Sequence, residues 1–270
     1  MIYKIEDILN KLEHCIEYKL PFSHIRFGDG GIKFIHCMLY GDLRQLATII
    51  RKEGLPQQKL TEIFELWGYY ARQADFIDTP EVYYNGEFWP RIKKPGKPIN
   101  AETDEKMREW KDLYERSEFD NENYCNPESN CLFIVKIPGK RNLLDFMKGK
   151  KVCCITAKPE IKTLFPEWDI VKIVGQWKNQ YANSFKEVVD IIKSTSRNYD
   201  FWLVAAGELG RIYSGLIKEN GGRCLDIGFI IEFWLTGYIH PRFHLFVNKP
   251  VDNRFELVLT DEGKKYERYI

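Results

Sequence analysis

Two glycine-rich turns carry the residues best suited to chemistry. In the early one, FSHIRFGDGGIKF, Arg26 is followed by Asp29, with Gly28 and Gly30 on either side of that acid. Glycine lets a backbone bend closely around a bound group, and a carboxylate held there can bind a divalent metal or a sugar hydroxyl. The guanidinium of Arg26 could grip a phosphate. An ordinary β-turn, in which Asp29 caps its own backbone, would explain the same residues.

The late turn lies in FWLVAAGELGRIYSGLIKENGGRCLDIG. An apolar run ends at Gly207, a helix is expected from Glu208, and a second apolar run ends at Asp226. In a β-α-β unit of this kind, the free N–H groups at the helix N-terminus favour a phosphate. Glu208 could contact a ribose or sugar hydroxyl, or simply complement the helix dipole. Close packing of strand on helix, without a ligand, is the alternative for the whole turn.

Periodicity predicts the elements that position these turns. Alternating or short apolar runs indicate strands at 22–27, 131–137, 151–156, 169–174, 201–207 and 223–228, with edge strands or a hairpin from 244–247 and 255–260. Helices are expected at 3–19, 32–40, 43–52, 56–74, 102–116, 143–147, 159–164, 184–194 and 208–219. Strands that alternate with helices predict an α/β fold with a mainly parallel, Rossmann-like sheet and helices on both faces.

No linker or internal repeat divides the chain, so a single domain over 1–270 is expected. Residues 75–128 change character, because the stretch YYNGEFWPRIKKPGKPIN has three prolines and no helical or strand period. Long irregular stretches inside compact domains are usually functional or disordered. We therefore expect an inserted flap at 75–128.

Charge and composition exclude several classes of partner. Forty basic and thirty-nine acidic residues leave a net charge of +1, so no strong field draws the protein to nucleic acid or to a membrane. The start has no signal-peptide pattern, and the longest apolar run contains Glu232, so a cytoplasmic location is expected.

The seven cysteines include no C-x-x-C pair, and the five histidines have no metal-binding spacing. Of these, only His24 lies near Arg26, on the same strand face.

The two turns together resemble glycosyltransferases of the GT-D type. The family's early pattern, F-S-x-x-R-x-G-D-G-E, is similar to this chain at Phe22, Ser23, Arg26, Gly28, Asp29 and Gly30. Its late patterns, D-x-x-L-V-A-x-G-x-x-G and G-x-x-A/C-L-D-I-G, resemble the segments 200–210 and 221–228. The stretch GQWKNQYANSF, with Lys178 and Asn183, looks like the family's asparagine-bearing loop.

This resemblance implies a hexosyltransferase-like enzyme. It would move a sugar from a nucleotide diphosphate sugar, with a UDP-sugar favoured, to a hydroxyl of a glycan, a glycoprotein or a modified nucleobase in DNA. On this basis we expect Asp29, Asp226 and Glu232 as catalytic residues, with Asp29 also a metal ligand. The expected substrate-binding residues are Arg26, Gly28, Gly30, Lys178, Asn183, Gly207 and Glu208.

One departure from the family pattern affects the metal. The family has paired acids, Asp-x-Glu, and here Gly31 occupies the second position. A single carboxylate holds Mn²⁺ or Mg²⁺ poorly without help from the diphosphate. Another acid, from among Asp226, Glu232 and Glu208, could replace the missing ligand. Alternatively, Arg26 and Lys178 could balance the diphosphate charge without a metal.

Two other functions fit parts of the sequence. A non-catalytic nucleotide-binding protein with a degenerate site would explain Gly31. A Rossmann-type methyltransferase would explain the V-A-A-G-x-x-G turn and the following strand that ends at Asp226. The glycine turn of that fold comes after the first strand, whereas here it comes near the end of the chain, which argues against the methyltransferase.

Overall fold

An eight-stranded parallel sheet forms the centre of the protein. The computed structural model describes residues 2–26, 54–78, 124–125, 133–175, 179–238, 247–248 and 255–264 of the 270. Neighbouring strands of this sheet all pair in parallel. Their order across the sheet is β1 (Ile2–Tyr3), β4 (Tyr124–Cys125), β3 (Phe76–Asp78), β2 (Phe22–Ile25), β8 (Arg223–Asp226), β7 (Phe201–Ala205), β5 (Val152–Thr156) and β6 (Asp169–Lys172).

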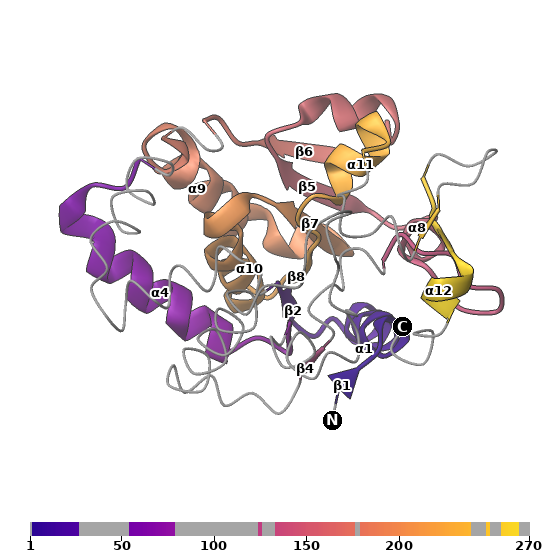
Figure 1. The fold of residues 1–270 in the computed structure, drawn as a ribbon. Helices are drawn as coiled ribbons and strands as arrows, with labels where there is room; N and C mark the ends of the chain where they lie inside the picture. The colour runs from indigo at the N-terminus through magenta and orange to yellow at the C-terminus, as the bar shows by residue number, and fades with distance from the viewer. Residues whose placement is uncertain are drawn as a thin grey trace, which may run out of the picture.

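Helices cover both faces of the sheet, as the alternation of strands and helices predicted (Figure 1). One face carries α1 (Ile5–Glu17), α8 (Leu143–Met147) and α11 (Ile230–Thr236), and the other carries α4 (Leu60–Arg72), α9 (Lys186–Thr195) and α10 (Gly210–Glu219). Side chains along a strand point alternately to the two faces. In β7, Leu203 therefore packs in the core beneath α1, whereas Trp202 and Val204 pack beneath α10. The sheet is thus the middle of three layers.

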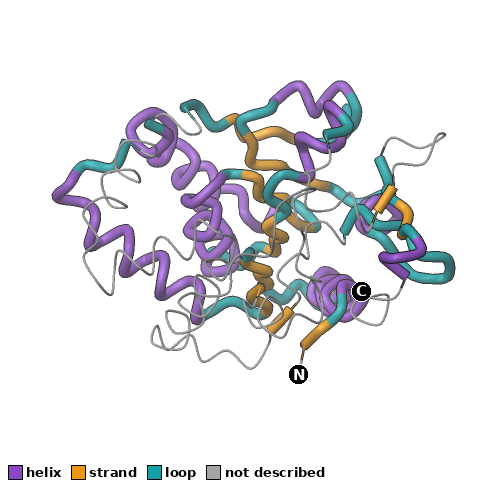
Figure 2. The backbone as a smooth tube through the Cα atoms, viewed as in Figure 1, coloured by secondary structure: helices purple, strands orange, loops and turns teal. Residues whose placement is uncertain are grey.

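Figure 2 shows how helices, strands and loops follow one another along the chain. Several connecting segments are 3₁₀- or π-helices and not the α-helices expected from periodicity. The 3₁₀-helices η1 (Gln57–Lys59), η2 (Pro159–Thr163), η4 (Ser196–Asn198) and η5 (Gly207–Leu209) lie before, between or after the longer elements. The segment η3 (Tyr181–Phe185) is a π-helix that leads directly into α9. The helix predicted at 159–164 is therefore only a 3₁₀ turn, and the one predicted at 184–194 begins inside a π-helix.

The strand predicted at 131–137 is wrong over the part that the structure describes. Val135 makes only an isolated parallel bridge with Leu257. The backbone of this segment bonds instead to the C-terminal stretch: Lys136 N–H donates to the carbonyl of Leu257 at 2.6 Å, and Leu257 N–H donates to that of Ile134 at 2.7 Å. The apolar run is buried because it fills the core beneath α1 and α8, and not because it belongs to the sheet.

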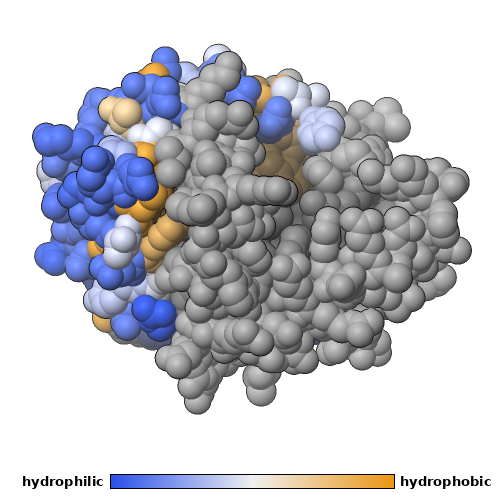
Figure 3. Space-filling view, turned by 60° about the vertical axis from the view of Figure 1, so that its left-hand side comes forward, coloured by the Kyte–Doolittle hydropathy of each residue, from blue (hydrophilic) through white to orange (hydrophobic). Residues whose placement is uncertain are grey.

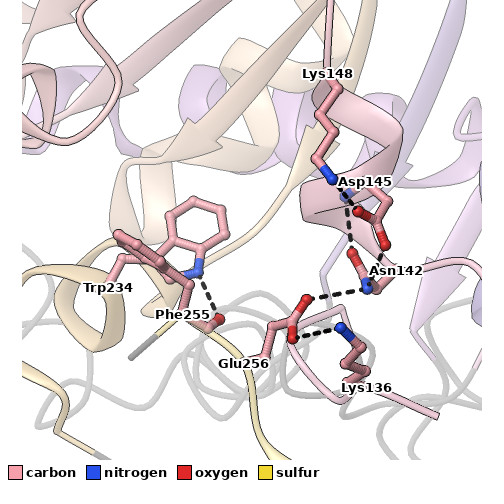
Figure 4. A network of polar contacts seen from close by, with 7 residues as sticks. All are labelled: Lys136, Asn142, Asp145, Lys148, Trp234, Phe255 and Glu256. Carbon is pink, nitrogen blue, oxygen red and sulfur yellow. Dashed lines mark hydrogen bonds and ion pairs between the residues drawn. The ribbon is translucent and has the colours of Figure 1, made fainter. Parts of the chain in front are cut away.

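A polar network fastens this C-terminal stretch to the domain (Figure 4). Glu256 is 5% exposed, accepts a hydrogen bond from Asn142 at 3.3 Å and pairs with Lys136 at 3.2 Å. Asn142 also caps the N-terminus of α8, where its side chain accepts from the Asp145 N–H at 2.8 Å. The indole of Trp234 on α11 donates to the carbonyl of Phe255 at 3.2 Å.

The C-terminal strands form a hairpin-like pair, and the two ends of the segment 75–128 belong to the central sheet. β9 (Val247–Asn248) and β10 (Val258–Leu259) pair antiparallel, as expected of a terminal hairpin, and α12 (Asp261–Lys264) follows. The two ends of 75–128 contain β3 and β4, so the central sheet extends into the expected flap at both of its boundaries. Residues 79–123 lie outside the described residues, as do the predicted helices at 32–40, 43–52 and 102–116.

Within the described residues, no helix is long and apolar enough to cross a bilayer. The side of the molecule that carries α4 and α9 is mostly hydrophilic where it is described (Figure 3). This agrees with the exposed charged side chains of Lys186 and Asp190 on α9.

Candidate functional site

The strand that leads to the early glycine-rich turn ends beside the segment that holds the late turn, at one edge of the sheet. β2, β8 and β7 are neighbours in the sheet and run parallel, so their carboxyl ends lie side by side. Arg26 directly follows β2, and its backbone N–H donates to Oδ2 of Asp226, the last residue of β8, at 3.4 Å. The other carboxylate oxygen, Oδ1, accepts from the Gly228 N–H at 3.2 Å. Asp226 is 5% exposed, so it joins the early and late parts of the chain from a buried position.

Arg211 adds a second link between these turns. This arginine of α10 is 3% exposed, and its Nε donates to the carbonyl of Arg26 at 2.9 Å. Its Nη1 donates to Oε2 of Glu208 at 2.8 Å and to the carbonyl of Gly207 at 3.3 Å. One buried guanidinium thus holds the end of β2 against the turn that follows β7. Because Glu208 is only 15% exposed, this ion pair is largely removed from solvent.

Sequence reasoning missed Arg211, although a signal was present. Arg211 follows Glu208 by three residues across the predicted start of a helix, which is the spacing of an ion pair. It is also in phase with Ser214, which is buried on the same helix. A basic residue on the buried face of a helix, with an acid one turn before it, predicts a partnered charge next to the sheet.

The connections that follow β5 and β7 leave the sheet on opposite faces, next to the contacts described above. β5 continues through η2, whose Ile161 packs in the core on the α1 side, whereas β7 continues through α10, whose Ile212 packs on the opposite side. In open α/β sheets, ligands bind at the carboxyl ends of adjacent strands whose connections leave on opposite faces. The turn at Gly207 borders this point, since it directly follows β7 and has a positive φ of 59°.

Gln180 is a second residue that sequence reasoning missed. It directly precedes η3, is fully buried, and donates from Nε2 to the carbonyl of Ala206 at 3.1 Å. Ala206 comes directly before Gly207, so Gln180 contacts the turn after β7. No pattern in the polar stretch KNQYANSF indicated that this glutamine would be buried.

The predicted site residues fall into three groups. The structure brings Arg26, Gly207, Glu208 and Asp226 together at the carboxyl edge. Two others are exposed: Glu232 on the first turn of α11, and Asn183 on η3, where it lines a surface hollow of about 560 Å³. The remaining predicted residues, Gly28, Asp29, Gly30 and Lys178, lie outside the described residues.

His24 belongs to the core. It is fully buried on β2, and its ring lies edge-on to that of Phe133 with the centroids 5.6 Å apart. Phe133 belongs to the core on the α1 side. This position fits a packing role.

The described residues do not by themselves form a site for Mn²⁺ or Mg²⁺. Within the described ranges, no three His, Cys, Asp or Glu side chains gather as they would around a metal ion. Both oxygens of Asp226 accept backbone N–H groups, and Glu208 is paired with Arg211. Each of these acids therefore has partners within the protein.

The sheet order and the joined turns define a three-layer α/β protein with a candidate ligand site at the carboxyl edge of a parallel sheet. No protein-family model and no curated protein matches this sequence. Solved structures do match it in fold. A selenomethionine-substituted structure of domain of unknown function 1792 (DUF1792) has a TM-score of 0.55 and 15% identity, over 98% of this chain and 93% of its own.

Two further structures of the same domain give similar values. One, described as showing that this highly conserved domain has a distinct glycosyltransferase fold, has a TM-score of 0.54 and 16% identity, over 100% of this chain and 94% of its own. The other, described as a new glycosyltransferase (DUF1792) from Streptococcus sanguinis, has a TM-score of 0.54 and 15% identity, over 100% of this chain and 97% of its own. This chain therefore has the fold of the DUF1792 structures.

Proposed function

We propose that this protein is a glycosyltransferase that moves a sugar from a nucleotide diphosphate sugar, with a UDP-sugar favoured, to an acceptor hydroxyl. The observation that carries the proposal is the hydrogen bond that joins Arg26, just after β2, to Asp226, at the end of β8, at the carboxyl edge of the sheet. Ligands bind at this edge in open α/β sheets. The likeness to structures described as glycosyltransferases supports the same activity.

The charges around the late turn suit a diphosphate. The Gly207 turn leads into η5 and α10, and N–H groups at a helix start attract anions. An unpaired carboxylate at Glu208 would repel a diphosphate there, but Arg211 neutralises it at 2.8 Å. Arg26, which is half-buried at the same edge, would add a positive charge. These groups would stabilise the charge that builds on the leaving diphosphate as the glycosidic bond breaks.

Asp226 is better placed than Glu232 to contact a sugar or acceptor hydroxyl. Two backbone N–H groups hold the carboxylate of Asp226 in a fixed orientation at the carboxyl edge of the sheet, beside the end of β2. Glu232 is exposed on α11. We therefore assign the hydroxyl contact to Asp226. Asp29, three residues after Arg26 in the sequence, remains our proposal for a second acidic group and, with help from the diphosphate, for a metal ligand.

Calorimetry with nucleotide donors tests the proposal. We expect the purified protein to bind UDP or UDP-glucose when each is titrated with and without Mn²⁺. GDP is titrated as a competing nucleotide. Arg26→Met should weaken this binding by roughly tenfold or more, because it removes a charge-assisted contact to phosphate. Arg72→Met is the matched control, since Arg72 is exposed at the end of α4, the helix that leads into the start of β3. If the wild-type protein binds none of these nucleotides, the donor assignment is wrong.

A non-catalytic nucleotide-binding protein is the second candidate, and Gly31 favours it. The acid that the GT-D pattern places there is missing from this chain. Gly31→Glu separates the two functions. A gain of UDP-glucose hydrolysis over an inactive wild type would indicate a binding protein with a decayed site. Loss of an existing activity on the same change would indicate an enzyme whose site works without that acid.

A further inference from the structure

Gln180 has a buried acceptor that no described residue uses. The side chain is fully buried, and Nε2 donates to the carbonyl of Ala206 at 3.1 Å. Because a carbonyl can only accept, the amide nitrogen must face Ala206, and this fixes the position of Oε1. Among the residues that the structure describes, Oε1 has no hydrogen-bond partner. Buried polar atoms are paired in the great majority of cases, so an unpaired one at this place requires an explanation.

The position of this acceptor connects it with the candidate site. Ala206 lies between the end of β7 and the Gly207 turn, and Gln180 is bonded to it directly. Oε1 belongs to the same small amide group as Nε2, so it lies beside that turn. The turn borders the place where the connections of β5 and β7 leave on opposite faces of the sheet.

The backbone around Gln180 is held in an uncommon conformation. Asn179 has a φ of 64°, which few residues other than glycine adopt, and the π-helix η3 begins at Tyr181. Gly54, from a distant part of the chain, packs against Asn179 so closely that a Cβ on it would lie 2.5 Å from the Asn179 Cα. Strained backbone and π-helical turns concentrate at functional sites, where the surrounding structure keeps them in place.

The chemistry of the acceptor limits the ligand group that it can bind. An amide oxygen cannot form a hydrogen bond with an ionised phosphate oxygen, because neither atom carries a hydrogen. Its partner must offer an N–H or an O–H. The described neighbours along the chain are partly apolar and aromatic: Ala206 is 1% exposed, and the rings of Tyr181 and Phe185 stack at 4.7 Å just beyond Gln180. Such surroundings suit the edge of a planar base better than a hydrated sugar.

We propose that Oε1 of Gln180 accepts a hydrogen bond from the imide N–H of the donor's base, which in uracil is N3–H. This inference rests on the proposed function, because it assumes a nucleotide donor at this edge. It makes Gln180 the residue that determines base specificity. Uracil carries an imide N–H and guanine a lactam N–H at the corresponding ring position, whereas cytosine and adenine carry a bare nitrogen there. Cytosine would face Oε1 with a second acceptor, and the two would repel.

Calorimetry with three nucleotides tests this assignment. We expect wild-type protein to bind UDP about 10- to 100-fold more tightly than either CDP or N3-methyl-UDP, because each of these leaves the buried acceptor unpaired. In Gln180→Met the affinity for UDP should fall to that for N3-methyl-UDP, so that the difference between the two ligands disappears. Gln73→Met is the matched control, since Gln73 is exposed at the C-terminus of α4. It should keep the wild-type preference.

The outcomes separate this inference from the proposed function. If the wild type binds UDP but binds N3-methyl-UDP or CDP equally well, the assignment of Gln180 is overturned while the donor site stands. If Gln180→Met still prefers UDP over N3-methyl-UDP as strongly as the wild type does, the assignment of Gln180 is also overturned. If no nucleoside diphosphate binds, the proposed function fails and this inference fails with it. Should Gln180→Met not fold, as judged by circular dichroism, the comparison of UDP with N3-methyl-UDP on the wild type decides alone.

Discussion

The backbone N–H of Arg26 donates to the side chain of Asp226 at 3.4 Å, although 200 residues separate the two in the chain. This contact exists because β2 and β8, which come from opposite ends of the sequence, pair as adjacent parallel strands. The end of β2, which leads to the early turn, therefore lies beside the end of β8. The carboxylate of Asp226 accepts backbone N–H groups from Arg26 and Gly228, and its proposed role follows from this position at the carboxyl edge of the sheet.

Replacing Asp226 by Asn should reduce turnover. The amide keeps one acceptor oxygen but places an NH₂ group against a backbone N–H that now bonds to the carboxylate. We expect UDP-glucose hydrolysis to fall about 100-fold or more, as is typical when a general acid–base group is removed. Glu232→Gln is the control, because that side chain is exposed on α11, and its rate should stay within about threefold of wild type. A larger loss in Glu232→Gln than in Asp226→Asn would reverse the two roles.

Arg211→Met should destabilise the protein strongly. It removes three hydrogen bonds and leaves Glu208 as a largely buried, unpaired carboxylate. Breaking a buried ion pair on one side typically costs about 3–5 kcal/mol in the free energy of unfolding, which urea denaturation would measure. Lys186→Met provides the comparison, because its ion pair with Asp190 is exposed and should contribute less than about 1 kcal/mol. Equal effects of the two substitutions would contradict the buried link.

Gly215→Ala should also destabilise the protein, for a steric reason. A Cβ at Gly215 would lie 2.0 Å from Cγ of Tyr70, on the facing helix α4, so α4 and α10 would have to separate. Overpacking of this kind typically costs about 1–3 kcal/mol, and more where a ring cannot move. Tyr70 is restrained because its hydroxyl donates to Glu219 at 2.7 Å.

Gly210→Ala is the matched control for this prediction. The nearest atom to a Cβ at Gly210 is Cγ1 of Val204 at 3.2 Å, so only a small adjustment is needed. Alanine is also favoured over glycine in a helix by about 1 kcal/mol, which offsets part of the cost. Urea denaturation should therefore rank Gly215→Ala as clearly the less stable variant. If the two variants unfold at the same urea concentration, the close approach of Tyr70 is not present in solution.

Stability should decline in alkaline solution, in part through Cys153. Burial, together with the negative charge of Asp169, raises the pKa of this thiol from 9.0 to about 12. The folded state therefore keeps the proton where the unfolded state loses it. The stabilising contribution is complete below pH 9 and is lost as the pH rises from 9 to 12, at about 1.4 kcal/mol per pH unit for one group.

Urea denaturation at several pH values between 8 and 11 measures this effect. Cys153→Ala removes the titrating thiol, so its stability should fall less steeply with pH than that of the wild type. The cavity that the substitution leaves lowers stability equally at every pH and does not change the slope. Parallel slopes for the two proteins would show that Cys153 titrates normally and is less buried than the structure indicates.

The sequence alone determined the fold class and the strands that lead to the two turns. Strands in the second half are short and apolar, and the helices between them have clear periodicity, so 151–156, 169–174, 201–207 and 223–228 were found close to their observed bounds. These signals are local, because each depends on side chains within one element. The prediction failed at 131–137 since an apolar run can be buried under helices as well as in a sheet.

Only the tertiary structure decided which of these residues act together. The pairing of β2 with β8 places Arg26 on Asp226, and no local pattern in either segment specifies that pairing. Arg211 and Gln180 gained their roles in the same way, since each is a common polar residue until burial gives it specific partners or, for Oε1 of Gln180, an acceptor that no described residue uses. Burial and long-range pairing are properties of the packed chain, and for this reason the sequence could name candidate residues but could not assemble the site.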